Sequence, residues 1–192
     1  YWSGWSNATV DGCATSTQNA GATLCSDDRR FGLWTRRTCD VDPDACPGAS
    51  PVTFELEDFQ DDSVTSGQTL NMESLLGNGP VLVVLLSGWC PYCQGQAAEL
   101  EQLKVDLANE GIPVTIAAIH SAGDEAFQGS LSDKCSFPLL QDTAEQDIWG
   151  TLGGGKDDMY IYTPGGVLHA YLPGSGEVNT DLSTNIGLLN VM

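Results

Sequence analysis

Positive charge is scarce in this sequence, and more than half of it lies near the start. Lysine and arginine together number 7 of the 192 residues, against 26 aspartates and glutamates, so the formal net charge is −19. All of the arginines precede residue 38, which leaves the rest of the chain strongly acidic. An acidic surface repels phosphate backbones and anionic lipid headgroups. We therefore expect no nucleic-acid partner.

Long hydrophobic runs are missing as well. The longest, Val81–Leu86, has the length of a strand buried on both faces and is far too short to span a bilayer. Hydrophobic residues make up 41% of the chain, which is enough for a core of its own. A chain of 192 residues suits one ordinary domain with a small extension. We expect no membrane insertion.

Histidine is too rare to complete a common type of zinc site. The sequence has two, His120 and His169, which are isolated from each other and from the pair Cys90 and Cys93. A structural zinc ion needs four ligands, usually supplied by a second Cys-x-x-Cys or by a histidine pair. We therefore expect the cysteine pair to do redox chemistry, with no metal and no organic cofactor.

A Cys-x-x-Cys motif is the most informative feature that is present. Cys90 and Cys93, separated by Pro91 and Tyr92, closely follow the predicted strand at 81–86. Proline suits the first position of a helix, so the pair lies at a predicted helix start, where free N–H groups and the helix dipole favour a thiolate. This context predicts a thiol–disulfide oxidoreductase with Cys90 as nucleophile and Cys93 as resolving thiol.

Four further cysteines lie in the first quarter of the chain, which is rich in glycine, serine, threonine and aspartate. A segment with so little hydrophobic periodicity needs covalent staples to hold a shape. Two structural disulfides require an oxidising compartment, so we expect a secreted, periplasmic or cell-surface protein. Four cysteines allow three connectivities, among which we favour pairing of sequence neighbours. The expected pairs are Cys13–Cys25 and Cys39–Cys46.

Turn formers at 47–51 predict a boundary between an extension, 1–50, and a main domain, 51–192. The order of elements in the main domain is βαβ followed by ββα, with a hairpin in front. This order predicts a thioredoxin-like α/β fold, a central mixed sheet flanked by helices. The predicted strands are 52–57, 65–70, 81–86, 114–119, 137–140, 159–162 and 167–172, and the predicted helices are 71–76, 91–110, 124–134, 144–152 and 180–191.

The extension has two short motifs in common with a known module. Trp2 and Trp5 are separated by one serine and one glycine, and Thr35–Cys39 contains two adjacent arginines. In this respect the extension resembles a thrombospondin type 1 repeat, in which tryptophans and arginines stack in a cation–π ladder. A disulfide-stapled extension packed on the main domain is the alternative.

The second half of the chain carries a distinctive series of residues. They are Glu99–Leu103, His120, Gln141, Asp147, Trp149, Leu152 and the run Lys156–Tyr162. With them, the segment 81–172 resembles the N-terminal thioredoxin-like domain of selenoprotein P. Cys90 stands where that family has selenocysteine, and the selenocysteine-rich and histidine-rich tail is absent from this sequence. The resemblance therefore implies a redox-active thioredoxin-like domain and does not extend to selenium transport.

Several residues are predicted neighbours of the cysteine pair. Trp89 should cover one side of it, and Tyr92 should be exposed. His120, at the end of a strand, would either exchange protons with the pair or hydrogen-bond to backbone. Thioredoxin-fold enzymes usually have a cis-proline before the third core strand, where this chain has Lys156 and Asp157. Lys156 would favour a thiolate and Asp157 disfavour it, unless both lie in an ordinary surface loop.

Two other functions stay open, and one cysteine remains unassigned. A thiol peroxidase would oxidise Cys90 with peroxide, although no arginine follows Arg37 to assist the thiolate. An adhesion or binding protein would use the fold as a scaffold. Cys135 is either a third redox thiol or, as we favour, a buried inert residue. For the oxidoreductase, the expected partners are protein or small-molecule thiols and disulfides.

Overall fold

The computed structural model describes residues 13–15, 23–25 and 50–174. Within these residues, no helix is long and apolar enough to cross a bilayer. The strands are β1 (Cys13–Thr15), β2 (Thr23–Cys25), β3 (Leu56–Glu57), β4 (Thr69–Leu70), β5 (Val81–Leu86), β6 (Thr115–His120), β7 (Leu139–Gln141), β8 (Met159–Tyr162) and β9 (Leu168–Leu172). The helices are α2 (Met72–Leu75), α3 (Pro91–Asn109), the 3-10 helix η2 (Glu125–Phe127), α4 (Gln128–Ser132) and α5 (Ile148–Thr151).

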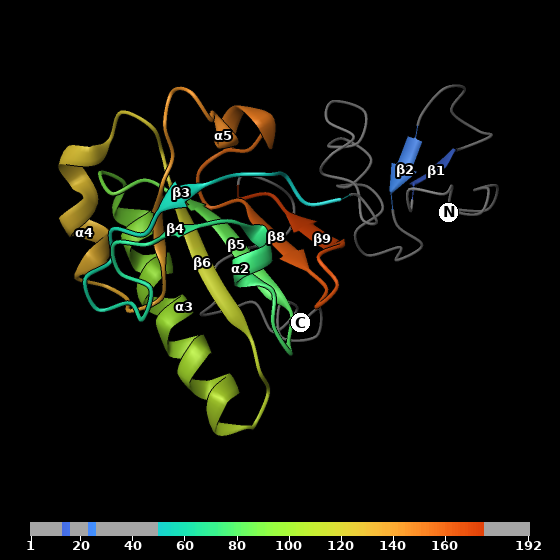
Figure 1. The fold of residues 1–192 in the computed structure, drawn as a ribbon, viewed down its shortest axis with the longest axis horizontal. Helices are drawn as coiled ribbons and strands as arrows, with labels where there is room; N and C mark the ends of the chain where they lie inside the picture. The colour runs from blue at the N-terminus through green and yellow to red at the C-terminus, as the bar shows by residue number, and fades with distance from the viewer. Residues whose placement is uncertain (1–12, 16–22, 26–49, 175–192) are drawn as a thin grey trace.

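Five strands form the central sheet, in the order β7-β6-β5-β8-β9 (Figure 1). β5 pairs in parallel with β6 and β6 with β7, whereas β8 runs antiparallel to both β5 and β9. The uninterrupted apolar run of β5 follows from its central place, because both of its faces are covered and all six residues are buried. The sheet is therefore mixed, as the sequence predicts.

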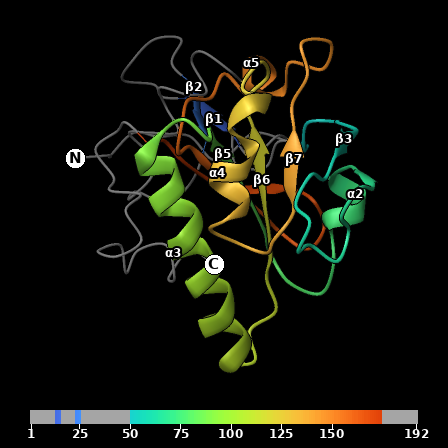
Figure 2. The same cartoon turned by 90° about the vertical axis from the view of Figure 1, so that its left-hand side faces the viewer.

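The two faces of the sheet bury two separate hydrophobic clusters. Side chains alternate along each strand, so Val81, Val83 and Leu85 enter one cluster while their even-numbered neighbours enter the other. The first cluster includes residues of α2 and α5, and the second includes residues of α3 and α4. The quarter-turn view shows α3 and α4 close together and α2 well away from them (Figure 2).

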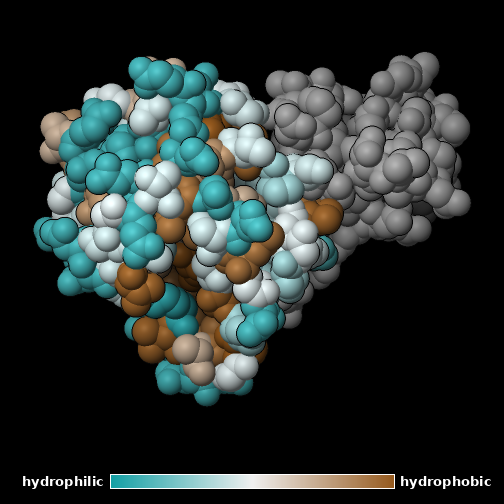
Figure 3. Space-filling model, viewed as in Figure 1, coloured by the Kyte–Doolittle hydropathy of each residue, from teal (hydrophilic) through white to brown (hydrophobic). Residues whose placement is uncertain are grey.

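The surface has both hydrophilic and hydrophobic regions. Hydrophilic residues cover much of the upper part of the view in Figure 3, and hydrophobic residues gather lower down, around the far end of α3. Val105 and Ile112, at and just beyond that end, are among the exposed large hydrophobic residues. This end of α3 is opposite to the one that carries the cysteine pair.

Local interactions shorten several predicted elements. The hairpin in front of the sheet has only the short strands β3 and β4. Beyond them the Asp58 N–H still donates to the Gln68 carbonyl, but the next N–H, that of Phe59, donates to the Leu139 carbonyl of β7. The helix predicted at 144–152 is restricted to α5, since its N-cap, Asp147, has a left-handed backbone with φ of 44°. The helix predicted at 124–134 is split into η2 and α4.

Part of what the sequence predicts falls beyond this description. The closing helix at 180–191, the tryptophans and arginines of the thrombospondin-like motifs, and Cys39 and Cys46 lie outside the described residues. β1 and β2 form an antiparallel pair in which Cys13 is directly opposite Cys25. That backbone register suits a disulfide between them, which stays a prediction together with the boundary at residue 50.

Candidate active site

The turn between β5 and α3 places the cysteine pair. Cys90 is the N-cap of α3, its backbone N–H donates to the Ser87 carbonyl over 3.1 Å, and Pro91 takes the first helical position. The Gln94 side chain reaches back to the Gly88 carbonyl over 2.7 Å. A Cβ atom at Gly88 would lie 2.1 Å from the carbonyl oxygen of Phe127, so only glycine fits there.

Both cysteines of the pair are free thiols and both are buried. The Cys93 backbone N–H donates to the Cys90 sulfur over 3.4 Å, the contact expected of an N-cap side chain. Cys90 keeps 6% of its surface exposed and Cys93 none. Burial raises the pKa of Cys93 well above its ordinary value, and its contact with Cys90 acts in the same direction. Cys93 is therefore held as a neutral thiol.

A third functional group, the carboxyl of Asp157, faces the two sulfurs. One ligand atom from each of Cys90, Cys93 and Asp157 lies within 4.8 Å of the others. Asp157 precedes β8, has a positive φ of 68°, and is 6% exposed. Burial raises the pKa of its carboxyl to about 6, although the nearby Cys93 thiol and the Lys156 charge act in the opposite direction. Within the described residues no peptide bond is cis.

The next carboxyl in the chain, Asp158, points to the other face of the sheet and has a full set of partners. It accepts hydrogen bonds from Gly155 N–H over 2.7 Å and from Gly174 N–H over 2.6 Å, and from the Tyr171 hydroxyl over 2.7 Å. Asp157 differs, because its Oδ1 atom is buried with no hydrogen-bond partner among the residues described.

Trp89 and Lys156 form one rim of the site. The Lys156 ammonium lies 4.4 Å from the centroid of the Trp89 ring, a cation–π contact. The indole N–H of Trp89 donates to Asp124 over 2.8 Å, and Asp124 also accepts from Ser87 over 2.7 Å and from Ser121. The hydrogen bond from Ser121, followed by those from Ser87 and Trp89, lowers the pKa of the Asp124 carboxyl.

Exposure at the site matches part of what the sequence predicts. Tyr92 and Trp89 each keep 47% of their surface exposed. Trp89 therefore flanks the pair instead of sealing it. Sequence reasoning missed Asp124, whose signal was its place four residues after the end of β6, at the edge where open α/β sheets bind ligands.

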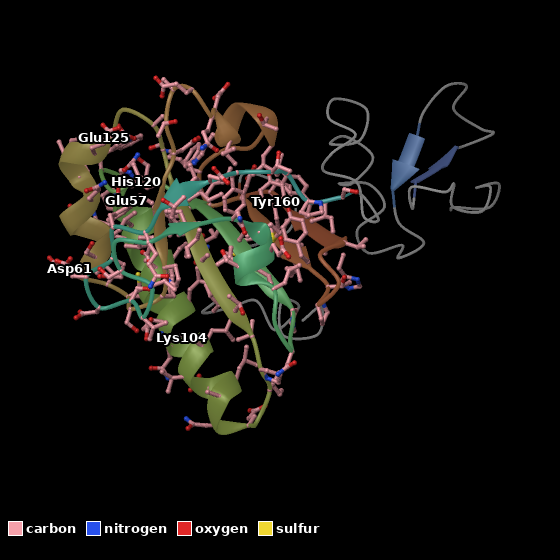
Figure 4. The ribbon with its side chains drawn as sticks, viewed as in Figure 1. Glu57, Asp61, Lys104, His120, Glu125 and Tyr160 are labelled. Carbon is pink, nitrogen blue, oxygen red and sulfur yellow. The ribbon has the colours of Figure 1, made fainter. Side chains whose placement is uncertain are left out.

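His120 is held by partners other than the cysteines. The Gly88 N–H donates to its Nε2 over 3.1 Å, so Nδ1 carries the proton and donates to the Gln141 side-chain oxygen over 3.0 Å. The ring is fully buried at the end of β6 (Figure 4) and meets Phe59 edge to face with centroids 5.6 Å apart. Burial lowers the pKa of His120. The structure thus favours the backbone-bonded interpretation over proton exchange with the pair.

Cys135 also has the surroundings of an inert residue. Its sulfur lies 3.7 Å from the Leu131 carbonyl oxygen and 3.8 Å from the Gln60 amide nitrogen. Burial raises the pKa of the Cys135 thiol to about 12, so it stays protonated near neutral pH. This is consistent with the favoured prediction for Cys135.

Comparisons with known proteins agree with the resemblance found in the sequence. The model of the family "Selenoprotein P, N terminal region" matches residues 65–175. Selenoprotein Pb of Danio rerio is 35% identical over 110 residues, which are 53% of this chain and 41% of that protein. The chain therefore spans less than half the length of this relative.

Solved structures support the fold. A secreted Mycobacterium tuberculosis disulfide oxidoreductase homologous to E. coli DsbE aligns with a TM-score of 0.53 and 20% identity, over 69% of this chain and 92% of that one. The thioredoxin domain of a Bacteroides vulgatus thiol-disulfide oxidoreductase aligns at 0.56 and 16%, over 77% and 99%. Yeast Sco1 aligns at 0.54 and 16%, over 74% and 99%. The fold is thioredoxin-like, as predicted.

Proposed function

This chain belongs to the family of the selenoprotein P N-terminal region, and on that premise we propose that it is an extracytoplasmic thiol–disulfide oxidoreductase acting through Cys90 and Cys93. The observation that carries the proposal is the closeness of the two sulfur atoms at the start of α3, which lie within 4.8 Å of each other. Two thiols this close can form a disulfide while the surrounding helix stays in place.

The two thiols differ in burial, and the difference supports the roles proposed for them. Cys90 lies at the N-cap and retains some exposure, whereas Cys93 is fully buried one turn into α3. The free N–H groups and the dipole of α3 stabilise negative charge on the Cys90 sulfur. The raised pKa of Cys93 keeps it protonated until Cys90 has reacted.

The reaction then proceeds in two exchanges. The Cys90 thiolate attacks one sulfur of a substrate disulfide, the substrate S–S bond breaks, and the departing substrate thiolate takes a proton from solvent. Cys93 loses its proton and attacks the Cys90 sulfur, which breaks the mixed disulfide and releases the second substrate thiol. The substrate gains two electrons and the Cys90–Cys93 pair becomes a disulfide. Run in reverse, the same steps oxidise a dithiol.

The exposed surface beside the pair suits thiol and disulfide substrates, and two other features favour a location outside the cytoplasm. Trp89 and Tyr92 offer exposed aromatic surface beside Cys90, which suits contact with a protein or a small-molecule disulfide. The cysteine-rich extension requires an oxidising compartment if its cysteines pair as expected. One structural neighbour with the same fold is described as secreted.

The peroxidase alternative lacks support among the described residues. No arginine occurs from residue 50 to residue 174 to stabilise the leaving hydroxide of a peroxide. The binding-scaffold alternative is favoured by one observation, a pocket of about 630 Å³ beside α2. Its lining includes Phe54, Met72 and Gly166, and the first two of these belong to the cluster on the face opposite to the cysteines. Ligand binding that survives Cys90→Ser would favour that function.

The reduction potential of the pair tests the proposal. Thiol trapping with mass spectrometry, across dithiothreitol and glutathione buffers that contain a chelator, reports the redox state of each cysteine. We expect a reversible two-electron transition between about −120 and −270 mV, the range of catalytic pairs. If the reduction potential of the pair lies below about −300 mV, the pair is a structural disulfide, and the oxidoreductase proposal is refuted.

A further inference from the structure

The tertiary structure completes a set of metal ligands that the sequence does not show. An inventory of cysteines and histidines leaves Cys90 and Cys93 two ligands short of a zinc site. The fold adds the carboxyl of Asp157, whose oxygen lies within 4.8 Å of both sulfurs. We propose that the reduced pair binds one Zn²⁺ ion through the two thiolates and the Asp157 carboxylate.

The distances fit a site that needs only a small adjustment. Zinc binds sulfur at about 2.3 Å and carboxylate oxygen at about 2.0 to 2.2 Å in a tetrahedral arrangement. Ligand atoms around one such ion are therefore about 3.5 to 3.8 Å apart. The three atoms already lie within 4.8 Å of one another, so side-chain rotation alone can bring them to an ion.

The unpaired oxygen of Asp157 independently points to a missing positive partner. Its Oδ1 atom is buried and accepts no hydrogen bond from the described residues, and the residue as a whole is only 6% exposed. Burying a carboxylate without a partner is costly, so such groups are usually paired or bound to a cation. Asp158, adjacent and also buried, has three hydrogen-bond donors. Among the described residues, the unsatisfied oxygen therefore belongs to the carboxyl that faces the sulfurs, whose other contact is the Cys93 thiol.

The backbone around the three ligands is fixed before any ion arrives. The Asp157 N–H donates to the Leu85 carbonyl over 2.7 Å, and the Leu85 N–H donates to the Asp158 carbonyl over 3.0 Å. These bonds tie the loop to β5, the strand that leads into the cysteine turn. Gly174 packs against the same loop, since a Cβ there would lie 2.8 Å from Asp157. A preorganised ligand set binds metal with little loss of conformational freedom.

The ligand types favour zinc over other thiophilic ions. Two thiolates with one carboxylate suit a borderline divalent ion, whereas Cu⁺ prefers sulfur ligands alone. Three protein ligands leave a fourth position for water, the arrangement of open zinc sites. Binding releases the two thiol protons and transfers no electrons. The disulfide form has no thiolates to offer, so zinc binds the reduced pair alone and blocks its attack on substrates.

This inference rests on the proposed function only in requiring that the pair can be reduced. Reduced wild-type protein is titrated anaerobically with Cd²⁺, a spectroscopic probe with a thiolate-to-metal charge-transfer band, and with Zn²⁺ against a chromogenic chelator. We expect one ion per chain and no charge-transfer band with the disulfide form. Asp157→Asn should weaken Zn²⁺ binding by at least about tenfold, since even indirect ligand partners contribute that much.

Two further variants make the result decisive. Asp157→Gly removes the carboxyl and suits the positive φ of this residue, so it keeps the fold if Asp157→Asn does not. Asp61→Asn removes the same charge from an exposed residue at the edge of the molecule (Figure 4) and should leave binding unchanged. Unchanged affinity in both Asp157 variants would overturn the proposal, and equal binding by the oxidised protein would show only adventitious attraction to acidic surface.

The potential measured in the presence of a chelator separates this proposal from the previous one. A pair that cycles at a catalytic potential but does not retain Zn²⁺ refutes the metal site and leaves the oxidoreductase intact. A pair that can be reduced only below about −300 mV refutes the oxidoreductase, while the zinc titration of the forcibly reduced protein still decides the metal site.

Discussion

The face of the sheet under α3 and α4 buries three thiols, an imidazole and an unpaired carboxyl, whereas the face under α2 and α5 buries aliphatic side chains and tyrosines. Asp157 and Asp158 are adjacent in the chain but point to opposite faces, and their carboxyls differ in hydrogen-bond partners. On the tyrosine face, three donors satisfy Asp158. On the cysteine face, the Oδ1 atom of Asp157 has no donor among the described residues and remains available to a proton or a cation.

The three thiols on one face are all buried but have different neighbours. Cys135 and Cys93 are both buried with raised pKa values, and both belong to the same hydrophobic cluster. They differ in what lies next to them, because Cys93 touches a second thiol at a helix start and Cys135 touches a carbonyl and an amide. The neighbouring group therefore distinguishes a candidate redox thiol from a packing residue.

The largest effect is expected from replacing the proposed nucleophile, Cys90, with Cys135 as the comparison. Cys90→Ser should lower the rate of disulfide reduction by more than about 10³-fold, because a serine hydroxyl is a much weaker nucleophile than a thiolate near neutral pH. Turnover of a model disulfide with a fluorescent product measures it. Cys135→Ser is the matched control and should keep both the rate and the reduction potential of the pair. A large loss of rate in Cys135→Ser would mean that the third thiol takes part.

The resolving step gives the next effect. Cys93→Ser should still react once with a substrate disulfide, because Cys90 remains, and should then stop at the mixed disulfide. Mass spectrometry after mixing with glutathione disulfide should find one added glutathione that stays bound. Failure to trap that adduct, with Cys90 still reactive to an alkylating agent, would contradict the roles assigned to the two cysteines.

A core substitution on the opposite face should separate stability from chemistry. Leu140 is fully buried in the cluster of the tyrosine face, so Leu140→Ala should lower the free energy of unfolding by about 2 to 5 kcal/mol. The reduction potential of the pair should not change. Denaturant unfolding and thiol trapping measure the two quantities. Leu139 is equally buried but lies on the cysteine face, so Leu139→Ala is the matched control. A shift of the reduction potential in Leu140→Ala alone would refute the separation of stability and chemistry between the two faces.

A smaller effect concerns pH and His120. Burial lowers the pKa of the folded-state imidazole more than the Gln141 hydrogen bond and the Asp124 and Glu125 charges raise it. The unfolded chain therefore takes up the proton first, and the free energy of unfolding should fall as the pH drops below about 6.5, by at most about 1.4 kcal/mol per pH unit. Chemical denaturation from pH 7.5 to 5 measures this slope. His120→Gln should flatten it, and an unchanged slope would assign the effect to other groups.

The smallest expected effect tests the rim of the site. Trp89→Phe keeps an aromatic ring beside Lys156 but removes the N–H that donates to Asp124. Because Trp89 is half exposed, the free energy of unfolding should fall by about 0.5 to 1 kcal/mol. Thermal and denaturant unfolding measure it, with Tyr92→Phe as an exposed aromatic control. A loss above about 3 kcal/mol would mean that Trp89 supports the whole turn.

The sequence by itself determined the features that depend on local spacing. An apolar run followed by Cys-x-x-Cys with proline between specifies a buried strand, a turn and a helix start, and β5 and α3 begin where this pattern predicts. The order of elements was enough to predict a mixed sheet with thioredoxin-like topology. Tyr92 was predicted to be exposed, and it keeps 47% of its surface exposed.

Only the tertiary structure decided which distant residues meet. The left-handed backbone of Asp147 shortens α5, and the Gly88 N–H donates to His120. Asp157 was a predicted neighbour of the pair, but only the structure shows that its carboxyl faces both sulfurs. These contacts depend on the pairing of β5 with β6 and β8 and on their register. Hydrophobic periodicity specifies which side of a strand is buried, but strand order and register specify its neighbours, and no local pattern in this chain encodes them.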